Sequence, residues 1–124
     1  MSDVPGMSRR EMEDRLKAFA LRVLDLTKAL PDDYRGRSMG SQVFRSATSV
    51  AANYRAAGRG KSKADFIAKL GIVQEEADET CFWLELIIEG GFVKASRVEP
   101  LLAEANEITA IITASLKSAK RRKL

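Results

Sequence analysis

The chain has 124 residues, of which 45% are hydrophobic and 31% are charged, a composition that is typical of a soluble globular protein. This length suffices for one core, and no apolar run is long enough to span a bilayer. There is no histidine, and Cys81 is the one cysteine, so an intrachain disulfide and a histidine-ligated metal site are excluded. We therefore expect a single domain over residues 1–124, without a signal peptide, in a reducing cytoplasm.

The first predicted helix covers about residues 8–29. Residues 1–7, which include the breaker Pro5-Gly6, are expected to be disordered. Ser8 and Glu11 have the spacing of a capping box, in which each side chain satisfies a backbone N–H of the first turn. Apolar residues at spacings of three and four predict one buried face, formed by Met12, Leu16, Phe19, Ala20, Val23, Thr27 and Leu30.

The second predicted helix covers about residues 39–57, after Pro31 and the loop PDDYRGR, and Ser38 or Ser41 is expected to cap it. Its inner stripe is Met39, Val43, Ala47, Val50, Ala51 and Tyr54. Its outer face carries mainly small side chains, which would let another backbone approach closely: Arg45, Ser49, Ala52 and Ala56, flanked by Ser46 and Asn53. The alternative is a plain solvent face, although such faces favour Glu, Lys and Gln.

The third predicted helix is capped by Ser62 and ends near Glu89. The turn GRGKS precedes it, and either Gly58 or Gly60 is expected to supply a left-handed residue there. A regular core seam is formed by Phe66, Leu70, Val73, Ala77, Thr80, Leu84 and Ile87. A second apolar stripe, with Glu79 among its residues, lies well round the helix and consists of Ile72, Phe82, Trp83 and Leu86. Because one seam satisfies a four-helix monomer, the second stripe predicts a further partner.

A fourth helix is predicted after the capping box formed by Ser96 and Glu99, with Pro100 in its first turn. Its core stripe is Val98, Leu102, Ala105, Thr109, Ile112 and Leu116. Residues 117–124 then form a basic tail. No strand pattern is present, so the predicted fold class is all-α, an antiparallel up-down-up-down four-helix bundle.

Two patches of basic residues are candidate nucleic-acid contacts, since Lys and Arg bind phosphates. The whole chain has 21 basic and 17 acidic residues and a net charge of +4. Five of the basic residues lie in the tail, so the rest of the chain is nearly neutral. The candidate residues are Lys117, Lys120, Arg121, Arg122 and Lys123 in the tail, and Arg59, Lys61 and Lys63 in the turn. A frayed, solubilising C-terminus is the alternative interpretation of the tail.

No catalytic constellation, cofactor motif or metal site is predicted. The acidic cluster Glu75, Glu76, Asp78 and Glu79 scatters around its helix. A carboxylate-only Mg²⁺ or Ca²⁺ site is conceivable there, but a solvated or salt-bridged face is the better interpretation. Arg45 is expected level with Glu75 and Glu76 across the hairpin. Cys81 lacks an activating histidine and is interpreted as a small buried hydrophobe.

The hairpin resembles the four-helix-bundle proteins encoded within intervening sequences of bacterial 23S rRNA genes. The similarity covers about residues 16–116, and its specific part is Arg45-Ser46-Ala47, Asn53, the Gly58-to-Phe66 turn with Ser62, then Glu76, Glu79 and Trp83-Leu84. One departure is Ala56, where relatives often carry Glu. The resemblance implies a ring-like homopentamer without assigned enzymatic activity. A similar basic pentamer is the accessory protein of diversity-generating retroelements, where it is linked to nucleic acid and reverse transcriptase.

These observations predict a non-enzymatic homo-oligomer that binds structured RNA, such as rRNA, or DNA. The alternative is a homo-oligomeric protein-interaction scaffold with no nucleic-acid role, and an enzyme is the third hypothesis. No membrane partner and no small-molecule substrate are indicated. The predicted oligomer interface comprises Arg45, Ser49, Ala52, Asn53, Ile72, Glu79, Phe82, Trp83 and Leu86, with Trp83 as its anchor because buried aromatic residues often dominate interfaces.

Overall fold

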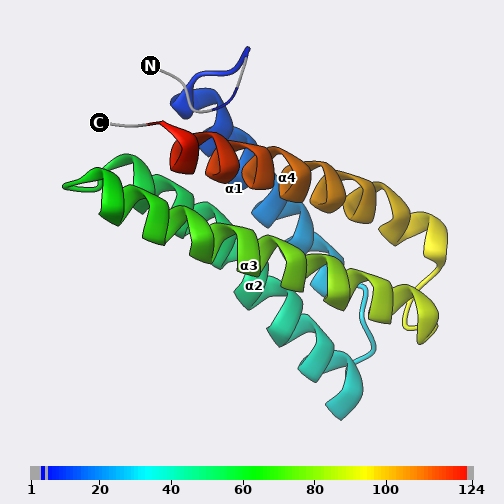
Figure 1. Cartoon of the computed structure of the whole chain (residues 1–124). Coiled ribbons are helices and arrows are strands. Elements are labelled where there is room, and N and C mark those ends of the chain that lie inside the picture. The colour runs from blue at the N-terminus through cyan, green and yellow to red at the C-terminus, as the bar shows by residue number, and fades with distance from the viewer. Residues whose placement is uncertain (1–3, 5, 123–124) are drawn as a thin grey trace.

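The chain folds into four antiparallel helices. The computed structural model describes residue 4 and residues 6–122, and contains α1 (Arg9–Thr27), α2 (Tyr34–Gly58), α3 (Lys63–Glu89) and α4 (Ala95–Arg121). Each helix packs against the next one in the chain, and α1 closes the bundle against α4 (Figure 1). Among the described residues the only β-type pairing is an isolated bridge between Val4 and Met7. The predicted fold class is therefore confirmed.

All four helices contribute to one hydrophobic core, as their three-four stripes predict. Its fully buried side chains include Leu16, Val50, Leu84 and Ile112. Two of the buried hydroxyls meet between helices: Thr80 Oγ1 is 2.9 Å from Ser46 Oγ and links α3 to α2. Because each hydroxyl also contacts a backbone carbonyl of its own helix, neither is left unsatisfied inside the bundle.

The second helix begins earlier than the sequence predicts. It starts at Tyr34, and the carboxylate of Asp33 caps it by accepting a hydrogen bond of 2.9 Å from the backbone N–H of Gly36. The predicted caps, Ser38 and Ser41, are therefore wrong. Gly36 is required because a Cβ at this position would overlap the backbone carbonyl oxygen of Pro31.

The glycine and capping predictions around α3 and α4 also need correction. Neither Gly58 nor Gly60 has a positive φ; next to α3 the left-handed glycine is Gly91, with φ 67°, just after the helix ends. The predicted capping box of the fourth helix is wrong, because α4 already begins at Ala95 and its N-cap makes no side-chain hydrogen bond. By contrast, the Ser8 capping box of α1 and the Ser62 cap of α3 are confirmed.

Described residues near both ends of the chain pack against the core. The side chain of Val4 is buried and Met7 packs against the core, so the prediction of disorder is wrong for these two residues. At the other end, α4 continues to Arg121 because Leu116 and Ala119 are buried. The predicted basic tail is thus largely helical. Residues 1–3, 5, 123 and 124 lie outside the described residues, and with them the candidate Lys123.

Candidate nucleic-acid interface

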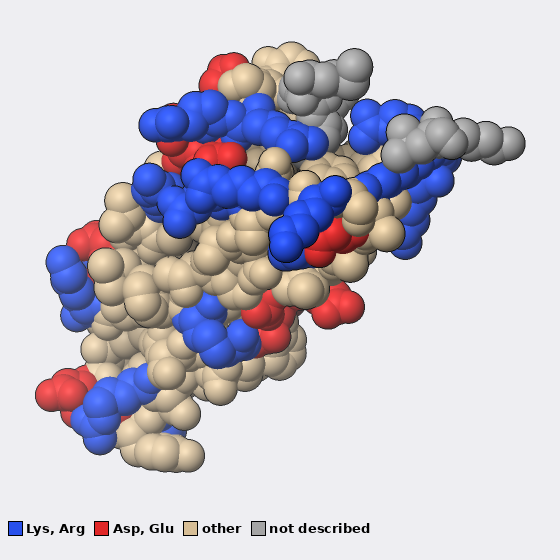
Figure 2. Space-filling model, turned by 90° about the vertical axis from the view of Figure 1, so that its left-hand side faces the viewer, with Lys and Arg blue, Asp and Glu red and all other residues tan. Residues whose placement is uncertain are grey.

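The antiparallel topology brings the two predicted basic patches to one end of the bundle. The start of α1, the α2–α3 turn and the end of α4 lie together (Figure 1). Figure 2 faces this end and shows Lys and Arg side chains gathered across it. We call this surface the basic end. Its described residues are Arg9, Arg10, Arg55, Arg59, Lys61, Lys63, Lys69, Lys117, Lys120, Arg121 and Arg122.

A hollow of about 530 Å³ lies in the basic end, between the last turns of α2 and the first turn of α3. Its one acidic residue, Asp65, accepts a hydrogen bond of 2.6 Å from Lys69, which lowers the pKa of Asp65. Arg55, Arg59 and Lys61 also line the hollow, and their side chains form no ion pair with any described residue. The hollow therefore has a positive lining of a kind that binds phosphate groups.

Arg9 connects α1 to this turn. Its guanidinium donates a hydrogen bond of 3.2 Å to the carbonyl oxygen of Gly58 and lies 5.0 Å from the ring centre of Phe66. Sequence reasoning missed the contribution of Arg9 and Arg10 to the basic end. The signal was available, because the predicted up-down topology already places the start of the first helix beside the end of the second and of the fourth.

Part of the predicted interface lies where α2 meets α3. Arg45 of α2 binds Glu76 at 3.2 Å and also pairs with Glu79 of α3, so the predicted charge pairing across the hairpin is confirmed for Glu76, with Glu79 in place of Glu75. Glu79 in turn accepts a hydrogen bond of 2.8 Å from the indole N–H of Trp83. Asn53 donates to Ser49 on its own helix.

The second apolar stripe of α3 is exposed except at Trp83. Trp83 packs against the core and its ring makes an edge contact with Phe82, with the ring centres 5.0 Å apart. Phe82 itself is 49% exposed, and Ile72 and Leu86 are 43% and 36% exposed. The large aromatic surface that faces solvent on α3 therefore belongs to Phe82 more than to Trp83.

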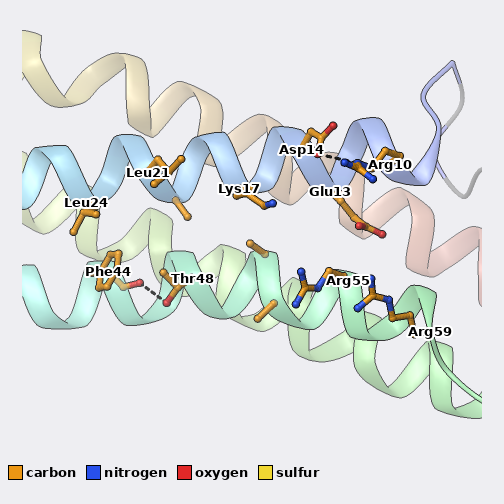
Figure 3. A pocket seen from close by; sticks show the side chains of 13 residues that line it. Arg10, Glu13, Asp14, Lys17, Leu21, Leu24, Phe44, Thr48, Arg55 and Arg59 are labelled. Atoms are coloured by element: carbon orange, nitrogen blue, oxygen red, sulfur yellow. Dashed lines mark hydrogen bonds and ion pairs between the residues drawn. The ribbon is translucent and has the colours of Figure 1, made fainter.

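A groove of about 430 Å³ between α1 and α2 was not predicted from the sequence (Figure 3). Its apolar residues include Leu21, which is 60% exposed, Leu24 and Phe44. A signal did exist: Leu21 and Leu24 are three positions apart and lie outside the core stripe of the first helix. From the sequence alone, Leu21 and Leu24 would be interpreted as a wider part of the core stripe. Only the position of α2 shows that they line a groove.

The described residues contain no cluster of three or more His, Cys, Asp or Glu side chains that could hold a metal ion. In the acidic cluster, Glu76 and Glu79 are bound by Arg45. Cys81 is buried, its sulfur lies 3.5 Å from the hydroxyl of Thr109, and burial raises the pKa of its thiol. Within the described part of the chain, none of the helices is both long and apolar enough to cross a membrane.

The fold and its surfaces define a small antiparallel four-helix-bundle protein with one strongly basic end and exposed apolar faces. The family model of the 23S rRNA-intervening sequence protein matches residues 11–114. The chain belongs to this family, and the resemblance noted in the sequence is confirmed.

A solved structure supports the same assignment. The chain is similar to the crystal structure of a protein of unknown function from the S23 ribosomal protein family of Bacteroides thetaiotaomicron. The two chains share 36% sequence identity and a TM-score of 0.78, and the similarity covers 85% of this chain and 97% of the other. No curated protein matches the chain.

Proposed function

We propose that the protein is a non-enzymatic homo-oligomer whose basic ends together bind structured RNA or DNA. The observation that carries this proposal is the convergence of the α2–α3 turn and the end of α4 on one surface. Clustered Lys and Arg side chains make phosphate contacts, which dominate affinity and depend little on sequence. The nearest aromatic residue, Phe66, lies under Arg9. The proposed binding is therefore electrostatic and poorly sequence-specific, without base stacking.

Assembly is part of the proposal because a single basic end would bind polyanions weakly. A ring presents one basic end for each protomer, and linked weak sites gain about 10²–10⁴ in affinity when they engage one ligand together. The homopentamer that the family resemblance implies is the assembly proposed here. The exposed apolar side chains of α3, such as Phe82, support association of some kind.

The test is a charge reversal at the basic end, Lys120→Glu together with Arg121→Glu. Its matched control is Lys28→Glu together with Lys94→Glu, which makes the same change in net charge at exposed positions of the opposite end. Fluorescence anisotropy with a labelled RNA hairpin and a labelled DNA duplex, over a series of salt concentrations, measures both. We expect the first variant to bind at least about tenfold more weakly, with a salt slope reduced by about one for each lost phosphate contact.

The control should retain the wild-type affinity and salt slope. An equal loss in both variants would mean that net charge alone, not the basic end, drives binding. If the wild-type oligomer binds neither probe at low salt, the nucleic-acid proposal fails. The protein-interaction scaffold, which the exposed apolar side chains of α3 also favour, would then take its place.

A further inference from the structure

The α1/α2 groove exposes apolar side chains that the fold does not cover. Its apolar lining includes Leu21, Leu24 and Phe44, which are labelled in Figure 3, and also Ala51. Leu21 and Leu24 are exposed and do not belong to the core. Polar residues at these two positions would therefore leave the core intact. A continuous apolar floor between two helices is the shape that accepts a ridge of side chains from a third helix.

The rim of the groove is mainly basic. Lys17, Arg55 and Arg59 line it, and none of them forms an ion pair with a described residue. Of the two acidic residues on the rim, Asp14 is already paired with Arg10 at 3.2 Å. An apolar ridge flanked by carboxylates would therefore match the groove in both shape and charge.

The outer face of α3 has these properties. No Lys or Arg occurs between Gly71 and Glu89. Gln74 and Cys81 contact α4, while Thr80 contacts α2, so the opposite side of the helix points outward. This outward side, which we call the acidic face, carries Ile72, Glu75, Asp78, Phe82 and Leu86, all exposed. Its two carboxylates form no ion pair with a described residue.

Gly71 is an independent sign that another molecule approaches this side of α3. It lies in the helix interior, where glycine costs roughly 0.5–1 kcal/mol relative to alanine. A Cβ at Gly71 would meet no atom within 4 Å, so packing inside the protomer does not require a glycine there. Close contact with a neighbouring protomer would explain it, since a glycine lets another molecule approach the helix backbone closely.

We propose that the acidic face of one protomer packs into the α1/α2 groove of a second copy. This inference rests on the homo-oligomer of the proposed function and names its two contacting surfaces. The contact is heterologous, because the two surfaces are different, and such contacts form closed rings or open filaments. One protomer carries both surfaces, the groove between α1 and α2 and the acidic face on α3, so it can contact two neighbours at once.

The test uses two variants that each damage one surface: Leu21→Glu in the groove and Phe82→Lys on the acidic face. Both side chains are substantially exposed, so the protomer should keep its fold, which circular dichroism and thermal unfolding check. Light scattering after size exclusion then gives the mass. Each variant alone should be a monomer. The control Ala110→Glu, at an exposed position of α4, should retain the wild-type mass.

Mixing the two variants tests whether the acidic face of one protomer contacts the groove of another. The Leu21→Glu protomer keeps an intact acidic face and the Phe82→Lys protomer keeps an intact groove, so a 1:1 mixture should give a dimer that cannot grow. An unchanged mass for Leu21→Glu would overturn the proposal, as would a mixture that stays monomeric. A monomeric wild type would overturn both this contact and the proposed homo-oligomer. If the wild type is an oligomer and both variants keep its mass, only the proposed contact is overturned. The binding assay with RNA and DNA would still test the basic end.

Discussion

The guanidinium of Arg15 connects α1 to α4. It makes two hydrogen bonds of 2.8 Å to the carboxylate of Glu104 and an ion pair of 3.0 Å with Glu107. The side chain of Glu104 is 19% exposed and that of Glu107 is 62% exposed. Bidentate, partly buried pairs are strong, whereas exposed pairs contribute little. Glu104→Gln should therefore lower the free energy of unfolding by about 1–2 kcal/mol, and Glu107→Gln by less than about 0.5 kcal/mol, in urea denaturation at pH 7.

The effect of Glu104→Gln should also depend on pH. The hydrogen bonds from Arg15 lower the pKa of Glu104 in the folded state below its unfolded value of about 4.3. A lowered pKa means that the stabilisation is complete above the unfolded pKa and is lost as the pH falls through the folded pKa. The difference in stability between wild type and variant should thus be constant near neutral pH and shrink below about pH 4. A difference that is the same at pH 7 and pH 3 would contradict this assignment.

At the scale of the element, the start of α2 depends on Asp33. Its carboxylate accepts a hydrogen bond from the N–H of Gly36 and lies at the positive end of the helix dipole. Asp33→Ala should lower the free energy of unfolding by about 1 kcal/mol. Ser41→Ala is the matched control, since Ser41 lies inside the helix and is exposed, and it should change stability by less than about 0.5 kcal/mol. If Ser41→Ala lowered the free energy of unfolding more than Asp33→Ala, Ser41 and not Asp33 would be the cap of α2.

The sequence predicted the helix interiors well and their ends less well, for a physical reason. Three-four periodicity reports which residues enter the core, and the stripe from Leu70 to Ile87 is buried as predicted. The ends depend on contacts that are distant in space. Gly36 suggested a loop, yet it lies in the first turn of α2, where the absence of a Cβ lets the chain pass close to Pro31. The sequence did not place residues 117–121 of the basic tail in the last helix, yet they are helical, and Ala119 among them is buried.

The basic end could be predicted from the sequence, whereas the groove could be recognised only once the position of α2 was known. The up-down order of the helices alone places Arg59 and Lys120 at the same end. The groove depends on the position of α2 beside Leu21, which periodicity does not report. Likewise the sequence favoured Trp83 as an interface anchor because of its type, but its indole is bound to Glu79 and packs on the core. The type of a side chain suggests that it makes contacts, but only the fold shows which residues it contacts.

The last prediction separates the charge of the α4 end from its structural role. Deleting residues 120–124 removes Lys120, Arg121 and Arg122 but keeps the buried Ala119. Deleting residues 117–124 also removes Ala119 and leaves part of the core around Leu116 uncovered. Both truncations should weaken RNA binding and flatten its salt dependence. Only the longer one should also lower the melting temperature, by about 4–8 °C for each kcal/mol of lost stability, because it alone removes apolar contacts. Equal melting temperatures for the two truncations would show that the helical end of α4 serves for charge alone.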